Sequence, residues 1–124
     1  MSAYAASPDA YRQSAVLTAT PGQLVVMLYD GARRFLRQAI SAMQEGDVEQ
    51  THLRLRRAEE IIRSLDSHLD FSQGEVAENL HALYGVFLRH LGRGRVERDP
   101  AKLEDVFRLM GELREAWASI AHAI

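Results

Sequence analysis

The sequence predicts an all-α fold: an antiparallel up-down four-helix bundle preceded by an N-terminal arm. Three observations support this prediction. Apolar residues recur with helical spacing in four long segments, no segment alternates as a half-buried strand does, and the connections between segments are short. The chain is expected to divide into an arm over residues 1–19 and a bundle over residues 20–124.

The first helix is predicted from about Pro21 to Gln44. Thr20 suits its N-cap, Pro21 suits the first helical position, and Gly46 suits its end. Apolar or small residues follow one face from Leu24 through positions 27, 28, 31, 32, 35, 36, 39, 40 and 43. Three large residues lie off that face, and we expect something other than the bundle core to cover them: Val25, Val26 and Tyr29.

The remaining helices follow from similar patterns. Asp47 is expected to open the second helix with Gln50 as capping-box partner, and Leu53 and Ile61 share a second face eight residues apart. The third helix is expected to start near Ser72, with Glu75 completing a capping box, and to end at Gly92 and Gly94. Asp99-Pro100 opens the fourth, whose apolar stripe runs from Leu103 to Ile124.

The N-terminal arm is too polar to fold alone, but it carries Tyr4 and Tyr11. Ser7-Pro8 is a candidate start for a short extra helix. Two interpretations of the arm stay open. It could pack permanently over the surplus apolar residues of the first helix, or it could be a displaceable cover over a partner site.

Composition limits the function. At 124 residues, with 47% hydrophobic and 26% charged residues, the chain is expected to be one soluble domain. A net charge of -2 gives no general reason to bind nucleic acid or an anionic membrane, and the absence of cysteine excludes disulfides and thiolate chemistry. No signal peptide or membrane-spanning run is seen, so we expect a cytoplasmic protein without membrane insertion.

No catalytic or metal site is predicted, and no cofactor is expected. Two E-x-x-H pairs, Glu49/His52 and Glu78/His81, are typical of di-iron bundles. In an antiparallel arrangement, however, the two histidines would lie roughly 12 Å apart along the helix axis. We therefore expect both to be boundary residues on partly buried faces.

Three smaller features have structural interpretations. The basic run from Arg89 to Arg98 is interpreted as a solvated loop, with a docking patch for an acidic protein surface as the alternative. Gly31, on the core face, predicts close approach by a bulky neighbour such as Tyr84 or Trp117. Asp30 could make a local polar contact or face a partner.

Together these features resemble the FliS family of flagellin secretion chaperones, along nearly the whole chain. The matching residues are Tyr4, Tyr11, Thr20-Pro21, Leu24, Leu28-Tyr29-Asp30-Gly31, Gly46-Asp47, Ala58, Ile61, Leu69-Asp70, Gly74-Glu75, Asn79-Leu80, Leu83-Tyr84, Asp99-Pro100, Glu112-Leu113-Arg114 and Ala116-Trp117. The chain departs from the family at Gly94-Arg95, where an Ala-Asn pair is usual, and at Gln73, where the first glycine of a Gly-Gly-Glu turn is usual.

The resemblance implies a non-enzymatic cytosolic chaperone that binds the disordered C-terminal region of flagellin. Such a chaperone blocks premature assembly and presents its cargo to the flagellar type III export gate. The candidate flagellin-binding residues are Tyr4, Tyr11, Val25, Val26, Tyr29, Leu53, Ile61, Tyr84 and Leu109. The alternative is a regulatory adaptor that sequesters another amphipathic helix, and an empty apolar face could also self-associate weakly.

Overall fold

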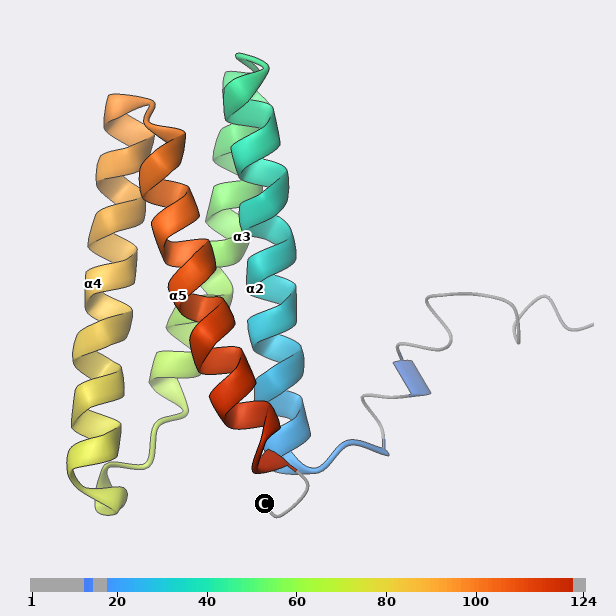
Figure 1. Cartoon of the computed structure of the whole chain (residues 1–124), viewed down its shortest axis with the longest axis vertical. Helices are drawn as coiled ribbons and strands as arrows, with labels where there is room; N and C mark the ends of the chain where they lie inside the picture. Colours follow the sequence, from blue (N-terminus) through green and yellow to red (C-terminus); the bar gives the residue numbers. More distant parts are fainter. Residues whose placement is uncertain (1–12, 15–17, 122–124) are drawn as a thin grey trace, which may run out of the picture.

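The computed structural model describes residues 13–14 and 18–121. Their long elements are α2 (Pro21–Gln44), α3 (Val48–Ser67), α4 (Glu75–Glu97) and α5 (Pro100–Ala118), with a short 3₁₀ helix, η1 (Phe71–Gln73), between α3 and α4. Successive helices run in opposite directions side by side (Figure 1), and no strand occurs in these described ranges. The predicted all-α up-down bundle is confirmed.

Two of the predicted helix starts agree closely with the structure. The Thr20 side chain accepts from Gln23 N, and the Gln23 side chain accepts from Thr20 N at 2.9 Å, which completes a capping box. Asp47 caps α3 by accepting from Gln50 N at 3.0 Å. At the end of α2, Gly46 adopts a φ of 77°, a left-handed conformation that glycine tolerates without strain.

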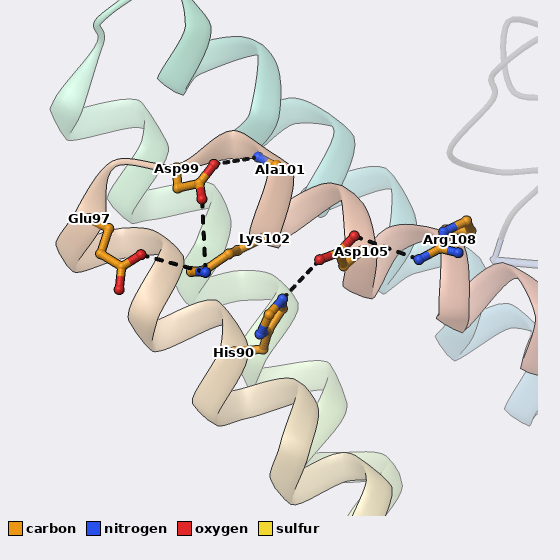
Figure 2. A network of polar contacts seen from close by, with 7 residues as sticks. All are labelled: His90, Glu97, Asp99, Ala101, Lys102, Asp105 and Arg108. Atoms are coloured by element: carbon orange, nitrogen blue, oxygen red, sulfur yellow. Dashed lines mark hydrogen bonds and ion pairs between the residues drawn. The ribbon is translucent and has the colours of Figure 1, made fainter.

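The turn between α4 and α5 is stabilised by several polar contacts (Figure 2). Asp99 caps α5 by accepting from Ala101 N at 3.0 Å, as predicted. Lys102 lies 3.5 Å from Glu97 and 3.9 Å from Asp99, so it bridges the two helices. Asp105 contacts His90 of α4 at 3.1 Å. These contacts connect the last turns of α4 to the first turns of α5.

The predicted start of α4 at Ser72 is wrong. Asp70 accepts from both the backbone N–H and the hydroxyl of Ser72, at 3.0 and 2.5 Å, and this local turn forms η1. The Ser72 hydroxyl is therefore engaged with Asp70, and α4 begins three residues later, after Gly74, without a side-chain cap.

The predicted end of α4 at Gly92 and Gly94 is also wrong. The helix continues to Glu97 and stops at Arg98, which has a φ of 55°. The basic run from Arg89 is therefore mainly helical rather than a solvated loop. Gly94 is buried, and a Cβ there would lie 2.6 Å from Leu103 Cδ1, so this glycine permits close contact between α4 and α5.

Near the C-terminus, α5 ends at Ala118 and Ile120 is exposed. The predicted apolar stripe of this helix extends to Ile124, which lies outside the described residues.

The hydrophobic core runs the length of the bundle. α2 packs most extensively against α3 and α5, while α4 contacts α3 and α5 less extensively. Fully buried side chains from every long helix meet in it: Tyr29, Leu36, Leu55, Ile62, Tyr84, Phe87, Leu91, Leu103, Val106 and Met110. None of the described helices is long and apolar enough to cross a membrane.

Candidate functional site

An apolar groove opens at one end of the bundle, where α2 and α4 begin and where α3 and α5 end. We call this the base end, and the groove the base groove. It has a volume of about 240 Å³. Its residues are Val25, Leu28, Leu65, His68, Leu69, Asp70, Val76, Ala77, Leu80, Tyr84 and Trp117.

The groove follows from the connection between α3 and α4. Residues 68–74 form this connection, whereas residues 45–47 and 98–99 suffice at the other two turns. The longer connection lets α4 start apart from the end of α3, and these two helices pack less extensively than α2 and α3 do. Apolar side chains that would otherwise close the core at this end instead line an open groove.

Two tyrosines lie beneath the groove. Tyr29 of α2 and Tyr84 of α4 are 0% and 2% exposed, and their hydroxyls are hydrogen-bonded at 2.5 Å. Burial raises the pKa of both phenols above the usual value, because the charged form would lose its hydration. The pair is therefore neutral near pH 7, and it joins α2 to α4 across the bundle.

The rim of the base groove exposes apolar surface. Four large residues near the element ends at the base end are exposed, by 37% for Leu24, 53% for Phe71, 64% for Val76 and 48% for Ile120, and of these Val76 also lines the groove. Beside them, His81 contacts Asp66 at 2.6 Å and packs edge-on against Phe71. A mostly apolar surface with few charged groups is suited to an apolar helix or strand of another protein.

The structure separates the predicted binding residues. Val25 and Tyr84 both line the base groove. The expectation that Val26 and Tyr29 lie outside the core is wrong, because Val26 is 9% and Tyr29 0% exposed. Helical spacing does not reveal the burial of Tyr29, because its hydrogen-bond partner, Tyr84, is 55 positions away in the sequence. Tyr4 and Tyr11 lie outside the described residues.

The other candidates lie elsewhere. Ile61 is half-buried against α2, with its Cδ1 3.4 Å from where a Cβ on Gly31 would be. Ile61, rather than Tyr84 or Trp117, is thus the neighbour that approaches Gly31. Leu53 is exposed on α3 and lines none of the grooves described here. Leu109 is 38% exposed and lines a second groove of about 270 Å³ between α4 and α5, with Val86 on its other side.

Sequence reasoning missed several walls of the base groove. Leu69, Val76, Leu80 and Trp117 follow the apolar stripes of their helices, a pattern that favours core positions. Their exposure depends on the separation of two helices at one end, which periodicity does not encode. The one available signal was position, because Leu69 and Val76 flank the longest connection in the bundle.

Asp30 forms an ion pair within the chain. Arg114 of α5 donates from Nε to Oδ1 at 2.9 Å and from Nη2 to Oδ2 at 3.3 Å. This pairing with Asp30 raises the pKa of Arg114. Asp30 thus makes a polar contact within the chain, as the first of its two interpretations expects, and the carboxylate links α2 to α5.

The histidines hold no metal cluster in the part of the chain that the structure describes, where no group of three or more suitable ligands occurs. His52 and His81 are both exposed rather than partly buried, so the boundary assignment is wrong for each. His81 is held by Asp66 instead.

The sequence is similar to known proteins along nearly its whole length. Residues 3–124 match the family described as Flagellar protein FliS. The chain is 37% identical over 111 residues to the flagellar secretion chaperone FliS of Salmonella typhimurium, covering 88% of this chain and 82% of that protein. It is 34% identical over 108 residues to the same chaperone of Bacillus subtilis, covering 87% and 80%. For the Escherichia coli chaperone the values are 36% over 110 residues, covering 85% and 79%.

Proposed function

Because this chain belongs to the FliS family of flagellar secretion chaperones, we propose that it binds the disordered C-terminal region of flagellin in the cytoplasm. The family is non-enzymatic, so the function is one of binding. In this proposal the chaperone keeps flagellin from polymerising prematurely and delivers it to the flagellar type III export apparatus.

The base groove is the observation that carries this proposal. A disordered segment that folds on binding must bury enough apolar surface to offset the entropy of ordering its chain. The groove offers a wall from each of four elements, including Val25 of α2, Leu69 beyond α3 and Trp117 of α5. Its exposed rim extends this apolar surface to Phe71 and Val76. A cargo helix with apolar residues at i, i+3, i+4 and i+7 fits such a surface.

The second groove supports a longer contact. Leu109 and Val86 expose apolar side chains on either side of it, between α4 and α5. A cargo of two short helices could place one helix in each groove. Tyr29 contributes indirectly, since it is buried and hydrogen-bonded to Tyr84, which lines the base groove, whereas the buried Val26 lines neither groove.

Calorimetric titration with the C-terminal segment of the same organism's flagellin tests the proposal. We expect tight 1:1 binding with a large negative heat-capacity change, since apolar burial is coupled to folding of the cargo. An unrelated amphipathic helix of equal length is the control and should bind far more weakly. Absence of binding at about ten micromolar, which corresponds to roughly −7 kcal/mol, would contradict the proposal and favour a regulatory adaptor with another partner.

A further inference from the structure

A pocket lies at the opposite end of the bundle from the base groove. We call it the distal pocket. Its volume is about 380 Å³, and it lies between the end of α2, the start of α3 and the end of α4. Its lining includes Met43, Val48, Val96, Arg95 and Arg98.

The distal pocket combines apolar walls with positive charge. Val48 and Val96 are 62% and 83% exposed, which leaves an apolar surface that the bundle itself does not cover. Two arginines and His52 provide the charged and polar part of the lining, and among the described lining residues none carries a carboxylate. The pocket therefore complements an anionic group attached to an apolar one.

Nearby carboxylates do not neutralise this charge fully. Glu59 pairs with Arg95 Nη2, but Arg95 Nε is buried and has no hydrogen-bond partner among the described residues. Glu97, the residue between Val96 and Arg98, is directed toward Lys102 on α5 (Figure 2). Arg98 makes no ion pair with any described residue. A guanidinium left free in this way can bind a carboxylate in a two-pronged geometry.

We propose that the distal pocket is a second binding site, which takes a peptide segment of a partner protein with a carboxylate next to an apolar side chain. The carboxylate pairs with Arg98 and the apolar side chain packs against Val48 and Val96. Since the pocket and the base groove lie at opposite ends of the bundle, both sites can be occupied together. The site goes beyond flagellin binding and does not depend on it.

A capped peptide with a central Leu-Glu-Leu sequence, and its Leu-Gln-Leu counterpart, provide the probe. The peptides are titrated into the full chain with labelled methyl groups, up to about 1 mM, a range suited to a minimal ligand. We expect the glutamate peptide to shift the methyl resonances of Met43, Val48 and Val96. The glutamine peptide should bind at least about tenfold more weakly, because it lacks the charge-assisted hydrogen bonds.

Variants locate the interaction. Arg98→Asn removes the charge, and asparagine tolerates the left-handed backbone at this position, so folding should be retained. We expect this variant to weaken binding of the glutamate peptide about tenfold. Val96→Ser should weaken it several-fold. Arg93→Gln, which removes one exposed positive charge of α4 outside the pocket, is the matched control and should leave binding unchanged.

Three results would overturn the proposal. Equal binding of the two peptides would remove the role of the carboxylate. Shifts confined to Val25, Leu69 and Val76 would place the peptide in the base groove. Concentration-dependent shifts of the distal methyls without peptide would mean that a second copy of this chain covers the pocket. None of these results depends on flagellin binding, so the two proposals can fail separately.

Discussion

The hydroxyls of Tyr29 and Tyr84 are hydrogen-bonded to each other, and both side chains are buried in the bundle. A buried hydroxyl without a partner costs more than the net stabilisation by a typical hydrogen bond, because its desolvation is not compensated. The two side chains therefore depend on one another. The groove above them depends on both, since Tyr84 forms part of its lining.

The first prediction concerns this dependence. Tyr84→Phe should lower the free energy of unfolding by about 1–2 kcal/mol, since it removes the hydrogen-bond partner of the Tyr29 hydroxyl on α4 and leaves that hydroxyl only its contact with Trp117. Tyr29→Phe should do the same, and the double variant should cost clearly less than the sum of the two. Urea unfolding of all four proteins measures the coupling. Strictly additive losses would mean that the hydroxyls do not interact.

The same pair gives a pH prediction. Burial raises the pKa of Tyr29 and Tyr84, so the folded state keeps protons that the unfolded state releases above the ordinary value of 10.0. The stabilisation is therefore fully present below pH 10 and is lost as the pH rises above it. Denaturation followed between neutral pH and pH 11 should show this fall. In the double phenylalanine variant the fall should be smaller, and an identical slope would contradict the assignment.

Single residues also test the base groove. Val76 is 64% exposed at its rim, so Val76→Ser should hardly affect folding. If flagellin covers this side chain, the lost apolar contact of about 1 kcal/mol should raise the Kd roughly fivefold. Val86 lies on the same helix and is 47% exposed, but it lines the second groove rather than the base groove. A Val86→Ser variant measured in the same titration therefore compares the two grooves, and a greater effect at Val86 would assign the principal contact to the second groove.

At the scale of whole helices, most of the fold could be predicted from local signals. Thr20-Pro21, Asp47 and Asp99-Pro100 mark helix starts because their side chains bind nearby N–H groups or fit the first turn, and such interactions are local in sequence. The end of α4 could not be predicted in this way. A glycine permits a helix to end but does not require it, and Gly94 is buried at a close contact with α5 that helical spacing does not encode.

The two glycines near the end of α4 provide the next prediction. A Cβ at Gly92 would meet nothing within 4 Å, so Gly92→Ala should stabilise the protein by about 0.5–1 kcal/mol through helix propensity. A Cβ at Gly94 would lie 2.6 Å from Leu103 and 3.3 Å from the Asp99 carbonyl oxygen. Gly94→Ala should therefore destabilise it by about 1–3 kcal/mol. Thermal unfolding compares the pair, and equal shifts of the same sign would contradict the close packing of α4 on α5.

For the molecule as a whole, the two ends of the bundle differ in chemistry. The base groove is lined mainly by apolar side chains, while the distal pocket adds two arginines to a smaller apolar surface. Helical periodicity predicts neither site, because each is formed by three or more elements that meet in space. The ion pair between Asp30 and Arg114 and the phenol pair lie between these ends and join α2 to α5 and α4.

The N-terminal arm gives the last prediction. The chain enters α2 at the base end, where Thr20 Oγ1 also donates to the Ala121 carbonyl at 3.1 Å, so the arm joins the bundle at the same end as the base groove. We propose that Tyr4 and Tyr11 cover part of this groove until cargo displaces them. Deleting residues 1–18 should then raise flagellin affinity, since binding no longer has to displace the cover. Thr20 remains in this variant, so the melting temperature of the bundle should change little. The double substitution Tyr4→Ser and Tyr11→Ser in the full chain should give the same increase in flagellin affinity. An unchanged or weaker affinity after deletion would mean that the arm packs permanently or contacts the cargo directly.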